Sequence, residues 1–176
     1  MKIAYTMAAG RGDTDLLLSR VARRLSDTGL RVCGTVQINS EREMDDPCDM
    51  DVKVLPDGPV IRISQALGKH SRGCRLDTSA LEDAVGFVTQ ELQKGADVLV
   101  INKFGKHEAE GRGFRDVIAD ALVKDITVLV GLNQLNLEAF KEFAGGLEIA
   151  LPPKEQDLFD WLEENCALTQ PAWHAH

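Results

Sequence analysis

The apolar run Ala96-Asp97-Val98-Leu99-Val100-Ile101 is followed directly by the polar, glycine-rich stretch Asn102-Lys103-Phe104-Gly105-Lys106-His107-Glu108-Ala109-Glu110-Gly111-Arg112-Gly113-Phe114-Arg115. A buried strand that opens into a basic loop is where an α/β protein normally holds an anionic ligand. The glycines of the loop are typical of backbone that turns sharply or approaches a ligand closely. This stretch therefore predicts an anion-binding site at the end of a parallel strand.

Working outward from this stretch, apolar runs alternate with amphipathic segments along the chain, which indicates a parallel sheet covered by helices. We expect strands at about 2–6, 31–38, 60–64, 96–101, 126–131 and 147–151, and helices at about 14–28, 77–94, 114–124, 136–144 and 154–166. Residues 39–59 contain three prolines and many acids, so we expect at most one short strand there, near 52–55. The fold class is a three-layer α/β domain, with a mostly parallel sheet flanked by helices.

The size and charge of the chain narrow the classes of function. With 176 residues, 44% of them apolar, we expect a single domain over 1–168 and a loose tail over 169–176. A net charge of -8 argues against sequence-independent binding to nucleic acid. No segment approaches the length of a membrane span, and the first residues lack the pattern of a signal peptide, so we expect a cytoplasmic protein that does not bind membranes.

The four cysteines are widely separated and predict neither a disulfide framework nor a metal site. Cys33 lies in a predicted strand and is most simply a core residue. Cys74 lies between Gly73 and Arg75, where cations would lower the pKa of a thiol, so two hypotheses stay open for it. It is a reactive or ligand-binding thiol, or an ordinary loop residue.

A second loop is predicted at the same edge of the sheet as residues 102–115. Residues 7–13 form a turn between the first strand and the first helix, and the loops that leave the carboxyl ends of parallel strands gather on one edge. The backbone N–H groups of this turn and the dipole of the following helix favour a bound anion. We therefore expect the two loops to lie side by side.

Residues 7–14 match the phosphate-binding pattern Gly-x-x-x-x-Gly-Lys-Ser/Thr in an altered form. Gly12 and Thr14 agree with the pattern, whereas Met7 replaces its first glycine and Asp13 replaces its lysine. That lysine normally meets the β- and γ-phosphates, which a carboxylate would repel. Arg11 is a candidate replacement charge. Asp13 itself either binds a cation or caps the helix together with Thr14, and capping is the favoured interpretation.

These motifs resemble those of the small nucleoside-triphosphatases of the P-loop class. Their first motif is similar to Gly-x-Pro-Gly-x-Gly-Lys-Thr, of which Gly10, Gly12 and Thr14 remain here. Their second motif is similar to Asp-Glu-Ile-Gly-Lys-Met-Glu, which reads Asn-Lys-Phe-Gly-Lys-His-Glu at 102–108. The resemblance implies that the lost acids held Mg²⁺ and oriented water. Asn102 and Lys103 cannot replace them fully, which indicates a degenerate catalytic site.

A more extensive resemblance is to an uncharacterised bacterial family of the same fold. It rests on Ile63-Ser64-Gln65-x-Leu67-Gly68, on Gly73-Cys74-Arg75-Leu76-Asp77, and on the motif Asn-Lys-Phe-Gly-Lys-x-Glu-x-x-Gly-x-Gly-Phe-Arg at 102–115. No established activity comes with this resemblance. It implies an association with molybdenum and nitrogen metabolism.

The candidate ligand-binding residues are the polar groups of both loops, joined by two arginines of the 65–76 loop. They are Gly10, Arg11, Gly12, Asp13, Thr14, Arg72, Arg75, Asn102, Lys103, Lys106, Arg112 and Arg115. Arginine side chains suit phosphate and other tetrahedral oxyanions such as molybdate. Glu108 is the candidate catalytic acid, or else an ion-pair partner. His107 is a proton donor, a metal ligand or a solvated side chain. The alternative to a convergent pocket is two solvated surface loops.

Three functions stay open at this stage. The first is a nucleotide- or oxyanion-binding protein without turnover, acting as a sensor or accessory factor, whose ligand is a nucleotide with Mg²⁺ or a tetrahedral oxyanion. The second is an active Mg²⁺-dependent nucleoside-triphosphatase in which Glu108 supplies the acid. The third is a protein with a vestigial site that contacts a protein partner through the acidic residues 41–51 or its C-terminal helix.

Overall fold

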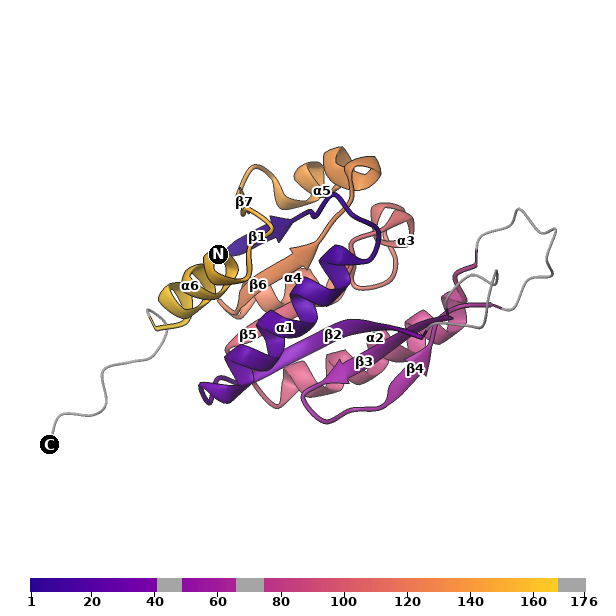
Figure 1. Cartoon of the computed structure of the whole chain (residues 1–176), viewed down its shortest axis with the longest axis horizontal. Helices are drawn as coiled ribbons and strands as arrows, with labels where there is room; N and C mark the ends of the chain where they lie inside the picture. The colour runs from indigo at the N-terminus through magenta and orange to yellow at the C-terminus, as the bar shows by residue number, and fades with distance from the viewer. Residues whose placement is uncertain (41–48, 66–74, 168–176) are drawn as a thin grey trace, which may run out of the picture.

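The computed structural model describes residues 1–40, 49–65 and 75–167, and within them a single sheet is covered by helices on both faces (Figure 1). Its strands are β1 (Ile3–Thr6), β2 (Val32–Ser40), β3 (Asp49–Leu55), β4 (Val60–Arg62), β5 (Val98–Ile101), β6 (Thr127–Gly131) and β7 (Glu148–Ala150). Its helices are α1 (Asp13–Asp27), α2 (Thr78–Gln93), α3 (Lys106–Ala109), α4 (Arg115–Val123), the 3₁₀ turn η1 (Gln134–Asn136), α5 (Leu137–Ala144) and α6 (Glu155–Ala167).

The sheet is mostly parallel, as the sequence predicts. The strand order is β4-β3-β2-β5-β6-β1-β7, in which β2, β5, β6, β1 and β7 pair in parallel. β5 and β6 are buried at every position, because a parallel sheet with helices on both faces exposes neither side of its central strands. The predicted three-layer α/β class is confirmed.

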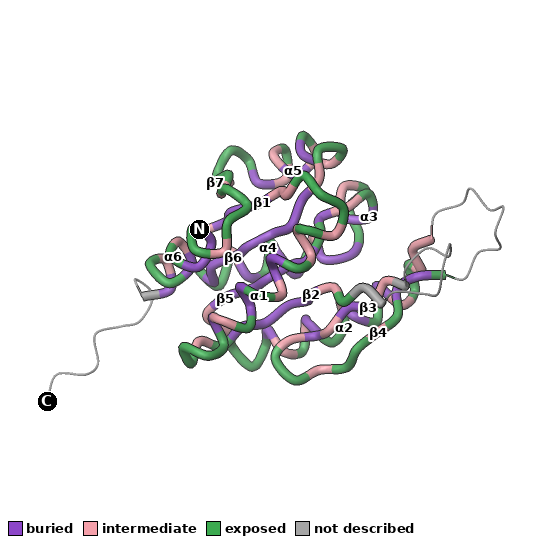
Figure 2. Tube along the Cα trace, in the orientation of Figure 1, coloured by how far each residue is buried: buried purple, intermediate pink, exposed green. Residues whose placement is uncertain are grey.

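Alternate residues of β5 enter two different cores, one on each face of the sheet. Val98 and Val100 pack with residues of α1 and α6, whereas Leu99 and Ile101 pack with residues of α2, α4 and α5. This division follows from the two-residue period of a strand. Figure 2 shows the buried strands between exposed helix surfaces.

The helix predictions hold in their main features. Leu17, Val21 and Leu25 of α1 are buried together, as their spacing predicts, and Leu158 and Leu162 of α6 are fully buried. The short helix α3 was not predicted, because four residues inside a polar loop carry no periodic pattern. The predicted tail over 169–176 lies outside the described residues.

The segment after β2 is more regular than the sequence predicts. Instead of one short strand near 52–55, β3 extends over Asp49–Leu55 and pairs antiparallel with both β2 and β4. Val52 and Val54 are buried on one side of β3 and alternate with polar residues, as a strand requires. The many acids nearby made this alternation hard to recognise in the sequence. The edge beyond β2 is thus a small antiparallel extension of the parallel sheet.

Cys33 is a core residue, as predicted. Its side chain is buried in β2, and burial raises the pKa of the thiol to about 11. Burial likewise raises the pKa of Cys166. Cys48 and Cys74 lie outside the described residues, so the reactivity of Cys74 stays a prediction.

Candidate functional site

The carboxyl ends of β1 and β6 form a crevice, because these neighbouring strands send their loops to opposite faces of the sheet. The loop after β1 enters α1 on one face, and the loop after β6 enters α5 on the other (Figure 1). Such a divergence is where open α/β sheets bind ligands. A cavity of about 390 Å³ occupies the crevice. It is lined by Ala8, Ala9, Gly10, Arg11, Gly12, Thr14, Asp15, Asn102, Lys103, Gly131, Leu132 and Asn133.

The turn between β1 and α1 is built by backbone geometry. Gly12 is the N-cap of α1 and adopts a left-handed conformation with φ 78°, and no side chain caps the helix. The favoured interpretation, that Asp13 and Thr14 cap α1, is therefore wrong. The Thr14 hydroxyl instead accepts a hydrogen bond of 3.0 Å from the backbone N–H of Ala8, which closes the turn on itself.

The first turn of α1 carries two acids, Asp13 and Asp15. Carboxylates at this end of a helix interact favourably with its dipole. Their negative charge also reduces the positive potential that would attract an anion. Arg11 and Lys103 are the cations that line the crevice. No salt bridge joins either of them to another residue in the described part of the chain.

Asn102 lies at the centre of a buried polar group at the end of β5. Its side chain is 4% exposed, and its Oδ1 accepts a hydrogen bond of 3.1 Å from the backbone N–H of Gln37. Its Nδ2 donates to Asp15 Oδ1 at 3.0 Å and to Gln37 Oε1 at 3.2 Å. Asp15 and Gln37 were not among the predicted site residues. Asp15 directly follows Thr14, which matches the phosphate-binding pattern, and this position in the chain could have identified Asp15 as a site residue.

The loop after β5 begins in the crevice and then turns away from it. The backbone N–H of Phe104 donates to the carbonyl of Gly131 at 2.9 Å, which holds the start of the loop against the end of β6. Asn102 and Lys103 consequently face the turn at 8–14, as expected.

Three predicted cations of this loop lie elsewhere. Arg112 is 2.7 Å from Glu110, and Lys106 is 3.8 Å from the same carboxylate. The hydrogen bond from Arg112 holds the pKa of Glu110 below its usual value. The guanidinium of Arg115 lies 4.7 Å from the centre of the Phe143 ring.

None of these three side chains lines the crevice, so the expected convergence of all the loop cations on Gly12 is wrong in its geometry. Local ion pairs and ring contacts direct them away. Arg75 lines a neighbouring cavity, and Arg72 lies outside the described residues.

Glu108 is a buried carboxylate that holds the loop together. Its side chain is 3% exposed, its Oε2 accepts a 2.9 Å hydrogen bond from the backbone N–H of Gly105, and its Oε1 accepts one of 3.2 Å from that of Phe114. The alternative of pairing with a lysine or arginine side chain is not what the described residues show. Its catalytic role stays a prediction.

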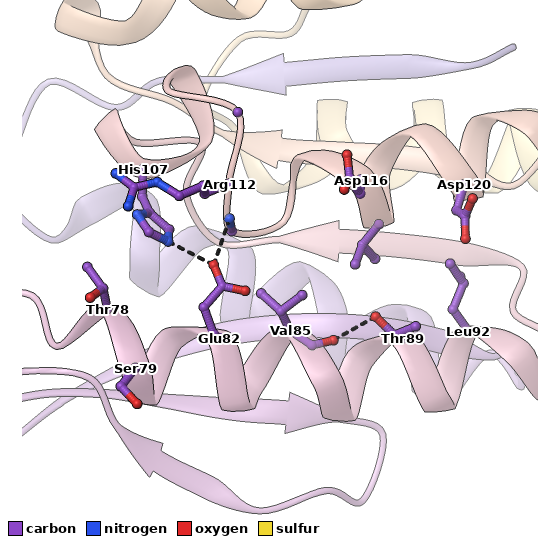
Figure 3. Close-up of a pocket in the computed structure, with 13 residues that line it drawn as sticks. Thr78, Ser79, Glu82, Val85, Thr89, Leu92, His107, Arg112, Asp116 and Asp120 are labelled. Carbon is purple, nitrogen blue, oxygen red and sulfur yellow. Dashed lines mark hydrogen bonds and ion pairs between the residues drawn. The ribbon is translucent and has the colours of Figure 1, made fainter.

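His107 is buried rather than solvated. Its Nε2 lies 2.8 Å from Oε1 of Glu82, which also accepts a 2.9 Å hydrogen bond from the backbone N–H of Gly113 (Figure 3). Glu82 belongs to α2, so one carboxylate joins this helix to the loop. No sequence pattern pointed to Glu82, because its partners lie 25 and 31 residues away.

This contact borders a cavity of about 740 Å³ between α2 and α4 (Figure 3). Arg112 lines this cavity together with the acids Glu82, Asp116 and Asp120. Arg112 therefore lines this cavity rather than the crevice.

Within the described residues, no group of three or more histidines, cysteines or acids is arranged to hold a metal ion. Asp15, Gln37 and Asn102 nevertheless supply oxygen atoms of the kind that Mg²⁺ accepts. No helix in the described part of the chain combines the length and apolar character that a bilayer crossing requires.

The fold is a P-loop NTPase-like α/β fold. The solved structure of a human cancer-related nucleoside triphosphatase superposes with a TM-score of 0.58 at 18% sequence identity, covering 97% of this chain and 98% of that one. The chain itself belongs to the DUF2478 family, described as proteins of unknown function, whose family model matches residues 3–161. The resemblance to a family of unknown function is thereby confirmed, and the resemblance to the small nucleoside-triphosphatases is confirmed in the fold.

A relative with a named role is the molybdenum import ATP-binding protein ModC 2 of Bradyrhizobium diazoefficiens. It is 34% identical over 160 residues, which cover 91% of this chain and 18% of that protein. The chain thus spans less than a fifth of the relative it matches.

Proposed function

We propose that the protein binds the phosphate groups of a nucleotide, or a tetrahedral oxyanion such as molybdate, in the crevice between β1 and β6 without hydrolysing it. The observation that carries the proposal is the crevice itself. It brings the glycine turn at the start of α1 together with Lys103 from the loop after β5. Backbone N–H groups at a helix start and a nearby lysine are the groups that cradle phosphate.

Binding without turnover is supported by how the polar side chains are used. The Asn102 amide is occupied by Asp15 and Gln37, and the Glu108 carboxylate accepts hydrogen bonds from two backbone N–H groups. Neither is left to activate water as a catalytic acid pair would. An active nucleoside-triphosphatase is the alternative function, and its hydrolysis would require Glu108 to release those bonds.

Two features bear on the ligand. The first turn of α1 is acidic, so a polyphosphate would bind together with Mg²⁺, with Asp15 as a candidate ligand through its oxygen atoms. The relative ModC 2 is named for ATP binding and molybdenum import, which supports a nucleotide or molybdate as the ligand here. Such a protein would serve as a cytoplasmic sensor or accessory factor.

The test combines ligand-dependent thermal stabilisation with a phosphate-release assay. We expect at least one of ATP, GTP, molybdate, tungstate and phosphate, each with and without Mg²⁺, to raise Tm without release of phosphate. Lys103→Ala should abolish the shift. Lys106→Ala is the matched control, because Lys106 lies on the same loop outside the crevice and should leave the shift unchanged.

No shift with any of these ligands would reject the proposal. Mg²⁺-dependent phosphate release that Glu108→Gln abolishes would establish the nucleoside-triphosphatase instead. The vestigial-site alternative concerns residues 41–51, most of which lie outside the described residues, or the C-terminal helix α6. It would gain support from a protein partner that binds Lys103→Ala as well as the unaltered chain.

A further inference from the structure

A second cavity, of about 370 Å³, adjoins the crevice on the side of β2, β3 and α2. The two cavities share Asp15, Asn102 and Lys103, so the hydrogen bond between Asp15 and Asn102 lies at their boundary. The size is within the range of pockets that bury small organic molecules. We call this second cavity the side compartment.

The walls of the side compartment are largely apolar. They are formed by Met50, Val52, Ile63, Leu76, Leu81 and Phe114. Val52, Leu81 and Phe114 belong to the main core on this face of the sheet. The compartment is a partly open cleft against this core, so its apolar walls are accessible to a ligand from solvent.

One hydroxyl group lines the side compartment among its apolar walls. Thr35 of β2 is 1% exposed and lines the compartment, but its hydroxyl is not among the fully enclosed unpartnered groups of the described residues, which belong to Thr127 and Glu148. Because the Thr35 hydroxyl faces the compartment without being fully enclosed, it is a polar group that a ligand can reach and that would set the ligand's orientation.

The charges that line the side compartment are balanced. Arg75 and Lys103 contribute two positive charges, and Asp15 and Glu108 contribute two negative charges. The compartment therefore has no net charge to attract an ion, in contrast to the crevice. An uncharged ligand fits it better than a phosphate does.

We propose that the side compartment binds an uncharged heterocyclic ring compound of nucleoside size, separately from the anion in the crevice. The apolar walls contact the flat faces of the ring, because ring faces are apolar. The polar edge of the ring bonds to the hydroxyl of Thr35. The anion and the ring compound are held next to one another across Lys103 and Asn102.

The experiment uses the full chain and the four nucleosides adenosine, guanosine, cytidine and uridine, which carry no phosphate. Binding is measured by saturation-transfer NMR and calorimetry, with and without 10 mM phosphate. This concentration would saturate an anion site with a Kd of about 1 μM, which it exceeds by a factor on the order of 10⁴. We expect at least one nucleoside to bind, and phosphate to leave that binding in place.

Thr35→Val removes the hydroxyl while keeping the shape of the side chain, and should weaken nucleoside binding about tenfold. Thr127→Val makes the same change at a buried position of β6 that lines neither cavity, and should leave nucleoside binding unchanged. Leu81→Trp fills the compartment and should abolish nucleoside binding.

The inference is overturned if none of the four nucleosides binds at millimolar concentration. It is overturned equally if a bound nucleoside is displaced by phosphate, or is insensitive to both Thr35→Val and Leu81→Trp, since the ligand would then lie elsewhere. Its failure is distinguishable from failure of the proposed anion site. Anion binding is tested with Lys103→Ala and phosphate-type ligands, which do not require the side compartment.

Discussion

At the residue scale, the loop after β5 depends on a close fit between Glu108 and Gly113. Gly113 has a positive φ of 61°, and a Cβ atom added there would overlap Oε1 of Glu108. Glu108 in turn fixes the backbone at Gly105 and Phe114. One carboxylate and one glycine therefore maintain the shape of the loop that contributes Asn102 and Lys103 to the crevice.

Gly113→Ala should lower the free energy of unfolding by about 2–4 kcal/mol, because it combines backbone strain with displacement of a buried carboxylate. Gly111→Ala is the matched control. Gly111 also has a positive φ, of 91°, but nothing lies within 4 Å of an added Cβ, so only the strain of about 1–2 kcal/mol applies. Urea denaturation measures both, and equal losses would contradict the role given to Glu108.

At the scale of the element, the acidic first turn of α1 sets the charge next to the crevice. Asp13 stands where the phosphate-binding pattern has lysine, and it lies at the positive end of a 15-residue helix. Asp13 does not line the crevice, but its carboxylate stabilises the helix and would oppose a phosphate bound nearby through its charge.

Asp13→Lys should consequently have opposite effects on stability and on binding. We expect a loss of about 0.3–1 kcal/mol in the free energy of unfolding, from the charge reversal at the helix start. Affinity for ATP with Mg²⁺ should rise at least fivefold, corresponding to about 1 kcal/mol of charge interaction. Asp27→Lys, at the other end of α1, should raise stability and leave affinity unchanged. Calorimetry showing weaker ATP binding to Asp13→Lys would contradict this account.

A second element-scale feature is the attachment of α2 to the loop through Glu82. Glu82→Ala removes the acceptor of the Gly113 N–H and the partner of His107 Nε2. Amide hydrogen exchange at Gly113 should accelerate at least tenfold, because its hydrogen bond to α2 is gone.

The control for this change is Asp83→Ala, one residue further along α2, where the side chain is exposed and makes no contact with the loop in the described part of the chain. Exchange at Gly113 should not change in that variant. Equal acceleration in both would show that α2 as a whole, rather than the Glu82 carboxylate, limits the opening of the loop.

At the scale of the whole molecule, the site is supported by an aromatic group that joins three parts of the chain. The ring of Phe140 in α5 lies edge-on to Tyr5 of β1 at 5.6 Å and to Phe104 of the loop after β5 at 5.2 Å. Such edge-to-face contacts add to the stability gained from burial. These contacts join β1 and the loop after β5, which both border the crevice, to the same hydrophobic core.

Phe140→Ala should therefore lower the free energy of unfolding by about 3–5 kcal/mol, since it leaves a cavity in this core. Phe87→Ala removes the same ring from a site that is 43% exposed on α2, and should cost less than about 1 kcal/mol. Thermal or urea unfolding compares the two. A similar loss in both variants would show that the aromatic group does not carry the stability assigned to it.

Much of this architecture could be predicted from the sequence, because the signals are local. The spacing of Leu17, Val21 and Leu25 identifies the buried face of α1, and the apolar run before Asn102 identifies a buried strand. The general rule that parallel strands end at one edge then brings residues 8–14 and Asn102 together, as the crevice shows. β3 was underestimated because its acidic neighbours hide its alternation.

The order of the elements, the parallel sheet and the meeting of the two loops follow from local patterns in the chain, since periodicity and turn residues act over short distances. The position of β6 between β1 and β5, and the turn of Arg112 and Arg115 away from Gly12, became clear only in the folded molecule. The partners of Asn102 and His107 were decided in the same way. Strand order and side-chain direction depend on packing between residues far apart in the chain, which a local pattern does not encode.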